Sequence, residues 1–356
     1  MHIDSHEKPE KYKKYINRKK IILVSAIGLL FFLFILAVSV GAVKIPFIKT
    51  ISLFFKNTAT MQQYLIVRSI RLPRALAAVF AGAGLAAAGV VMQAILNNPL
   101  GSPFTLGLSH AAAFGAALSV MLFGSGSMQS SATDAVKITN FYLTTGSAFF
   151  FCLLTALIIL SMSKIKKASP QVMILAGVAL GSLFTAGTMF LQYFADDTQL
   201  AAMVFWTFGD VSRASWKELY IIMGTTITLA GYFIFNSWNY NAICSGDETA
   251  RSLGINVEKI RLISMMAASL LAAVIISLLG IIGFVGLICP HIVRKLIGED
   301  HRFLIPGSII TGSILLLAAD TCARTVMLPH VLPVAILTSF LGAPLFLYLI
   351  IKGHTK

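Results

Sequence analysis

Three long stretches of this chain contain no Asp, Glu, Lys or Arg: residues 75–133, 219–246 and 262–293. Each exceeds the roughly 20 apolar residues that an α-helix needs to cross the hydrocarbon core of a bilayer. A backbone exposed to lipid must satisfy its own hydrogen bonds, so these stretches are expected to be helical. Strands of an outer-membrane barrel would be short and would alternate in polarity. The stretches therefore predict an all-α polytopic membrane protein.

The composition agrees with this class. Hydrophobic residues make up 57% of the 356 and charged residues 12%, whereas an ordinary soluble protein has about 25% charged residues. The net charge of +14 does not indicate a nucleic-acid partner, because the basic residues flank the apolar stretches. Residues 1–20 alone contain seven Lys or Arg, which is typical of a cytoplasmic anchor beside anionic lipid.

Prolines, glycines and charges divide the sequence into about ten expected transmembrane helices. The first long stretch is interrupted at Asn97-Asn98-Pro99 and Pro103, because proline removes a backbone donor and restricts the preceding residue. A similar break around Pro290 in the second half favours an inverted repeat of helices 2–5 and 7–10. The expected helices are residues 21–43, 76–96, 104–123, 140–162, 170–193, 219–235, 262–279, 284–297, 303–319 and 332–351.

An even number of helices places both termini on one side. If the termini are cytoplasmic, that side holds 18 of the 28 Lys and Arg residues. This is an excess of basic residues on the cytoplasmic side, as the positive-inside rule requires. The sequence thus predicts a cytoplasmic tail (1–20), one transmembrane domain (21–351) with a cytoplasmic loop at 237–261, and a short cytoplasmic tail (352–356). Four linking segments are also expected: a surface segment at 44–63, a loop at 124–137, a short surface helix within 195–215 and an extracytoplasmic corner at 320–330.

A polar island, residues 241–261, separates the second and third uncharged stretches. Ser245 and Glu248 have the spacing of a capping box, and Asp247 and Glu248 suit the positive end of a helix dipole. Gly254 stands where a left-handed residue would end the helix. The island therefore predicts a rigid two-turn helix, residues 246–253, which lies at the membrane surface and on which a soluble partner pushes.

Several kinds of chemistry have no sequence signal. There is no GxxxxGK[ST] loop to hold ATP phosphates and no HExxH metal motif. The four cysteines form no CxxC pair. Apolar spans without clustered acidic or histidine side chains do not indicate a proton or bare-cation pathway. We therefore expect no catalytic residue, no bound metal and no cofactor, and any iron that crosses would arrive inside a chelator.

Five segments of the sequence form a further pattern: RLPRALAAVFAGAGLAAAGVVMQAILNNPLGSP (71–103), GDETARSLGINVEK (246–259), GFVGLICPHIVRKLIGEDHR (283–302), AADTCAR (318–324) and LPVAILTSFLGAPLFLYLI (332–350). In this order, the segments resemble the FecCD-like permeases of ABC importers for iron–siderophores, haem and vitamin B12. The resemblance implies a non-enzymatic permease subunit in the bacterial cytoplasmic membrane, with an iron–siderophore as the expected cargo. It also implies a second permease subunit, identical or related, two cytoplasmic ABC ATPases and an extracytoplasmic substrate-binding lipoprotein.

The resemblance also assigns residues. It places the island helix in a groove of the ATPase, through Ser245, Gly246, Asp247, Glu248, Arg251 and Gly254. It places the extracytoplasmic Arg71, Arg74 and Arg324 against acidic residues of the binding protein, where a planar guanidinium can hold a carboxylate with two bonds.

Simpler interpretations compete with each assignment. The island helix can be a solvated loop helix, Arg71 and Arg74 can anchor their helix at the membrane interface, and Arg324 can pair with Asp320 one turn earlier. Two other functional classes stay open. An ion-coupled transporter would work without an ATPase, and a membrane enzyme built on Gly107-Leu-Ser-His110 would lose turnover in Ser109→Ala.

Overall fold

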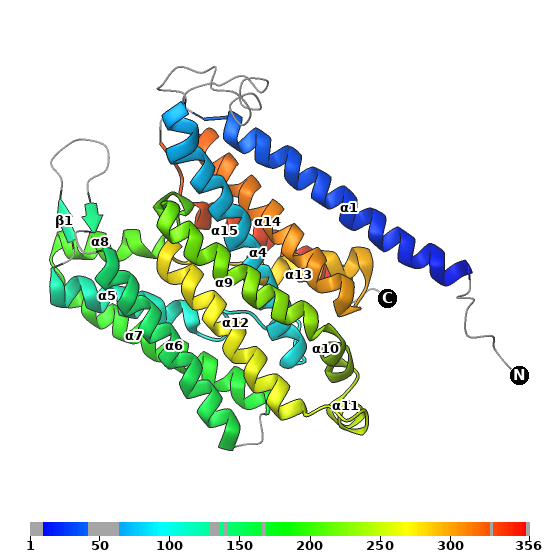
Figure 1. Cartoon of the computed structure of the whole chain (residues 1–356). Coiled ribbons are helices and arrows are strands. Elements are labelled where there is room, and N and C mark those ends of the chain that lie inside the picture. The colour runs from blue at the N-terminus through cyan, green and yellow to red at the C-terminus, as the bar shows by residue number, and fades with distance from the viewer. Residues whose placement is uncertain are drawn as a thin grey trace, which may run out of the picture.

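The structure is a computed structural model that describes residues 10–41, 64–124, 126–128, 136–138, 141–165, 169–327 and 330–353 (Figure 1). The expected surface segment 44–63 lies outside the described residues. So do residues 1–9 of the first tail and 354–356 of the last.

The described part is almost entirely helical. Its elements are α1 (Glu10–Ser39), η1 (Ile66–Arg71), α4 (Leu72–Ile95), α5 (Leu108–Phe123), β1 (Gly126–Met128), β2 (Val136–Ile138), α6 (Phe141–Ile165), α7 (Pro170–Phe194), α8 (Asp197–Thr207), η2 (Val211–Arg213), α9 (Trp216–Phe235), α10 (Ser237–Cys244), α11 (Asp247–Ser252), α12 (Val257–Leu279), α13 (Val285–Ile297), α14 (His301–Thr325) and α15 (Val334–Gly353).

The all-α membrane class is confirmed. Among the described residues, seven helices are long and apolar enough to cross a membrane, counting η1 and α4 as one. The shorter apolar helices α5 and α15 and the thirteen-residue α13 occupy the other three expected spans. This count is consistent with about ten helices.

Several boundaries differ from the prediction. The first helix begins at Glu10 instead of residue 21, and Lys19 lies over the rings of Tyr15 and Phe303, so the first tail is helical in part. Where a loop is expected at 124–137, β1 and β2 pair as antiparallel strands, and β2 ends one residue beyond it at Ile138. The expected corner 320–330 is wrong in its first half, because α14 continues to Thr325.

The helix contacts follow the pattern that a repeat of helices 2–5 and 7–10 requires. α4 packs on α14 as α12 packs on α6, α5 packs on α6 and α7 as α13 packs on α14 and α15, and α4 meets α13 as α12 meets α5. α4 and α12, the first helices of the two repeats, are antiparallel, because Arg261 near the start of α12 bonds the carbonyl of Ile95 at the end of α4. An inverted repeat has this arrangement.

The second of the two broken elements lies earlier in the sequence than predicted. The first broken element is the break at residues 97–107, which joins α4 to α5. Pro290 lies inside α13, so the second broken element, the counterpart of the first in the repeat, is the turn at residues 280–284. Gly107 caps α5 with a φ of 73°, and Phe284 caps α13 with a φ of 67°. Both caps are in the left-handed region, which is costly for a side chain as large as that of Phe284.

Helix α4 forms the centre of the bundle because its Ala- and Gly-rich sequence lets neighbouring backbones come close. A Cβ added to Gly89 would lie 1.8 Å from the carbonyl oxygen of Gly286 in α13. At Gly82 the same addition would lie 2.2 Å from the carbonyl oxygen of Gly312 in α14. Two neighbours of α4 thus approach it at backbone distance.

Gly89→Val is expected to lower the free energy of unfolding by about 3 kcal/mol, because the α4–α13 contact must open. Gly28→Val is the matched control, since a Cβ there meets nothing within 4 Å. The comparison is the thermal midpoint of each variant in detergent. Equal midpoints for the two variants would show that the backbone contact does not hold α13 in place.

Candidate functional site

The segment between α9 and α12 lies at the end of α4 that contains Ile95. α10 continues directly from α9, and the six-residue α11 follows it. Gly254, with a φ of 80°, follows α11 as predicted. The predicted capping box is wrong: the Ser245 hydroxyl donates to the carbonyl of Asn241 at 3.2 Å. Ser245 is the C-cap of α10, in a right-handed helical conformation, so its side chain bonds backwards along that helix, and Gly246 is the N-cap of α11.

One face of α11 is attached to the bundle, and the other is exposed. Ala250 is buried in a cluster with Ile243 and Val257. Asp247 forms a two-bonded ion pair with Arg261, at 2.8 and 3.1 Å. Glu248 and Arg251 are exposed and are therefore available to a partner.

A second attachment ties α10 to the start of α14. The Asn241 side chain donates to Asp300 at 3.0 Å and accepts from the backbone N–H of His301 at 2.8 Å. Burial of Asp300 opposes its ionisation, but hydrogen bonds from Arg302 and Asn241 outweigh burial and hold its pKa at about 2. Asp300 is thus a stable anion that caps α14 and holds α10.

The three arginines expected to dock a binding protein lie at the opposite end of α4. Arg71 donates to the carbonyls of Val38 and Ser39, each at 2.9 Å. Arg74 and Arg324 both pair with Asp320, at 2.8 and 3.2 Å, and the Asp320 side chain is fully buried.

The arrangement matches the competing interpretation in which Arg324 pairs locally with Asp320. It adds Arg74, 246 residues away in the sequence, as a second partner of the same carboxylate, and no local sequence pattern predicts this contact. All three guanidinium groups bind groups of this chain. Docking through them remains a prediction.

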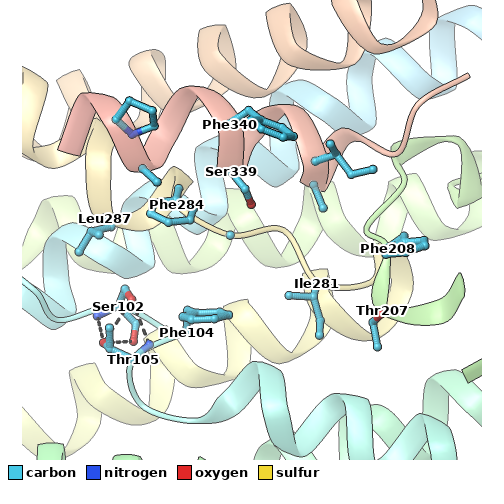
Figure 2. A pocket seen from close by; sticks show the side chains of 15 residues that line it. Ser102, Phe104, Thr105, Thr207, Phe208, Ile281, Phe284, Leu287, Ser339 and Phe340 are labelled. Atoms are coloured by element: carbon cyan, nitrogen blue, oxygen red, sulfur yellow. Dashed lines mark hydrogen bonds between the residues drawn. The ribbon is translucent and has the colours of Figure 1, made fainter. Parts of the chain in front are cut away.

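A cavity of about 670 Å³ lies where the two broken elements meet helix α15 (Figure 2). Ser102, Phe104 and Thr105 come from the break after α4, and Phe284 and Leu287 come from the start of α13. The rest of its lining is Thr207, Phe208, Ile281, Gly283, Ala335, Ile336, Ser339, Phe340, Ala343 and Pro344. None of these side chains is charged, and none is a His, Cys, Met or Tyr.

A neighbouring hollow of about 510 Å³ shares Phe104 and Thr105 with this cavity and extends along α7 past Gly177 and Gly181. Within the described part of the chain, no group of three His, Cys, Asp or Glu side chains could hold a metal ion. The cavity can therefore accept a large, mainly apolar body, and the described residues of its lining include no carboxylate, imidazole or thiol group.

The chain is similar to known transport proteins over most of its length. A model of the FecCD transport family matches residues 29–352. An ABC transporter permease protein of Methanocaldococcus jannaschii is 52% identical, with 98% of this chain and 99% of that protein covered. A hemin transport system permease protein of Yersinia pestis is 35% identical, over 84% of this chain and 87% of that protein.

A solved structure has the same fold. It is an inward-facing conformation of a metal-chelate type ABC transporter, with a TM-score of 0.80 and 29% identity. The match covers 94% of this chain and 99% of that chain.

Proposed function

Because the chain belongs to the FecCD transport family, it is a permease of an ABC importer, and we propose that it carries an iron–siderophore chelate. ATP is hydrolysed by a separate subunit, and the chain lies in the cytoplasmic membrane. The observation that carries the proposal is the uncharged, Phe-lined cavity at the junction of both broken elements.

The lining of the cavity favours a cargo that brings all its own iron ligands. A siderophore encloses iron with its own oxygen ligands, whereas haem leaves axial positions that histidine, methionine, cysteine or tyrosine commonly fill. The lining of the cavity has none of these side chains, whereas His110 and Met189 line the neighbouring hollow. Haem is the second candidate, supported by the similarity to a hemin permease, and vitamin B12 is the third.

The partners follow from the two polar ends of α4. An ABC ATPase would contact α11 through Ser245, Gly246, Asp247, Glu248, Arg251 and Gly254. An extracytoplasmic binding protein would dock at the opposite end, near Arg71, Arg74 and Arg324, and a second permease would complete the path. In this orientation α11 and both termini are cytoplasmic. The contact of Lys19 in α1 with Phe303, three residues after the Asp300 cap, supports a common side.

Reconstitution tests the function directly. Proteoliposomes that contain this chain, its partner ABC ATPase and its binding protein are supplied with ferrichrome, ferric citrate, haemin or cobalamin. We expect ATP-dependent uptake, fastest with the ferric hydroxamate ferrichrome. A preference for haemin or cobalamin would refute the siderophore assignment and leave the importer assignment standing.

The same system separates an ABC permease from an ion-coupled transporter. Without the ATPase, the chain is expected to accumulate none of the four chelates under a proton or sodium gradient. Robust accumulation under those conditions would show that the permease works without ATP hydrolysis and would overturn the proposal.

A further inference from the structure

α11 is too short to be stable alone, since isolated helices shorter than about 12–15 residues are marginal in water. It has six residues. Its orientation therefore depends on its attachments, and one of them reaches deep into the bundle. Arg261, which holds Asp247, is itself 2% exposed.

The guanidinium of Arg261 joins three elements. Two of its nitrogens bond the two carboxylate oxygens of Asp247 in α11. Its Nε donates to the carbonyl of Ile95, the last residue of α4, at 2.7 Å. The last carbonyls of a helix lack partners within it and carry partial negative charge, so a buried cation is well matched there.

The end of α4 leads directly to the cavity. Residue 97, two positions after Ile95, has a φ of 46°, and the break that begins there supplies Ser102, Phe104 and Thr105 to the cavity wall. A movement of Asp247 relative to α12 must stretch or reorient the bonds of Arg261. If the bonds of Arg261 are kept, the carbonyl of Ile95 would be displaced, and the break that follows it would be displaced as well.

The other ion pair of α11 lacks such a connection. Arg251 and Glu258 are 3.7 Å apart, and their side chains are 54% and 48% exposed. Exposed pairs of this kind contribute little. Both pairs join α11 to α12, but the Arg261 side chain is 2% exposed whereas both side chains of the Arg251–Glu258 pair are about half exposed.

We propose that Arg261 is the positioning residue that transmits movement of α11 to the end of α4, and so to the cavity wall, through its simultaneous bonds to Asp247 and Ile95. The proposal rests on the proposed function, in which an ATPase moves α11. It assigns the coupling to one buried side chain that touches neither ATP nor cargo.

The first test needs only the purified full-length chain in detergent. Hydrogen–deuterium exchange is compared for Asp247→Asn and Glu258→Gln. Asp247→Asn is expected to increase exchange at the end of α4 and across residues 97–107, because Arg261 loses its ionic partner. Glu258→Gln is expected to leave that region as in the wild type. Unchanged exchange in Asp247→Asn would overturn the link, whatever the protein transports.

The second test measures transport per ATP hydrolysed in the reconstituted importer, with the chelate that the wild type carries fastest. Asp247→Asn is expected to lower this ratio by about tenfold, within the range of mutations along a coupling route. Glu258→Gln should match the wild type. Equal ratios for the two variants would overturn the inference, whereas an idle wild type would overturn the proposed function instead.

A charge swap separates a three-way junction from a simple ion pair. In Asp247→Arg with Arg261→Asp the pair is restored, but an aspartate cannot donate to the Ile95 carbonyl and is repelled by the negative end of α4. We expect that the swap does not restore coupling. The single variant Arg261→Lys, which keeps the charge but has one ammonium group in place of the planar guanidinium, is expected to retain part of the coupling. Full recovery in the swap would show that the bond to α4 is dispensable.

Discussion

Replacing Asp320 with Asn is expected to lower the free energy of unfolding by about 3–5 kcal/mol, the usual cost of removing one partner of a buried ion pair. The Asp320 side chain is fully buried and is shared by Arg74 and Arg324. Without its charge, two guanidinium groups from different helices lie close together in a poorly hydrated site. Chemical denaturation of the detergent-solubilised variant measures the loss.

Asp210→Asn is the matched control. Asp210 lies 3.6 Å from Arg74 at the edge of the same cluster, and its side chain is 28% exposed. Its replacement is expected to cost no more than about 1 kcal/mol, because the 3.6 Å contact is long and the Asp210 carboxylate keeps access to solvent. If the two variants were equally stable, the buried carboxylate would not be what holds α4 to α14.

The same cluster decides how docking of a binding protein should be tested. Charge reversal at Arg71 and Arg74 would place new carboxylates against backbone carbonyls and against Asp320. It is therefore expected to reduce the yield of folded protein as well as any affinity for a partner. Only a loss of affinity in protein that folds normally would support docking at these arginines.

The long apolar helices could be predicted from sequence because their ends are marked locally. α7 begins at Pro170 as predicted and ends at Phe194, one residue beyond the expected end. The end of α14 could not be predicted in this way, because Asp320 and Arg324 look like the polar boundary of a span. They stay within the helix since each neutralises the other, together with Arg74, which lies 246 residues away in the sequence from Asp320.

The segment from α10 to the start of α12 also contains features that the sequence predicts and features that it does not. Gly254 could be predicted because its left-handed conformation is a local property of glycine. The capping box could not, since it depends on whether Ser245 ends α10 or begins α11. In the sequence, Arg261 is distinguished only as one of the 18 basic residues assigned to the cytoplasmic side. A single basic residue at the edge of a long apolar stretch was the available signal, but its bond to Ile95 depends on how α4 and α12 pack.

Ala343→Trp is expected to reduce ATP-dependent chelate uptake at least about tenfold, which corresponds to about 1.4 kcal/mol on the barrier to passage. Ala343 lies on the wall of the cavity that α15 forms. An indole there would occupy space opposite the two broken elements, where a bulky cargo would have to pass. Uptake and ATP hydrolysis are measured together in proteoliposomes, and hydrolysis is expected to continue because α11 is unchanged.

Leu347→Trp is the control for the added indole. Leu347 is one turn further along α15, is 60% exposed and does not line the cavity. A tryptophan there should leave uptake near the wild-type rate, because large aromatic side chains are tolerated on an exposed apolar helix face. Both substitutions add an indole to the same helix, so the two variants differ in whether the new side chain faces the cavity. Wild-type uptake in Ala343→Trp would place the route of the chelate elsewhere, and equal losses in both variants would point to damage to α15 rather than to a blocked path.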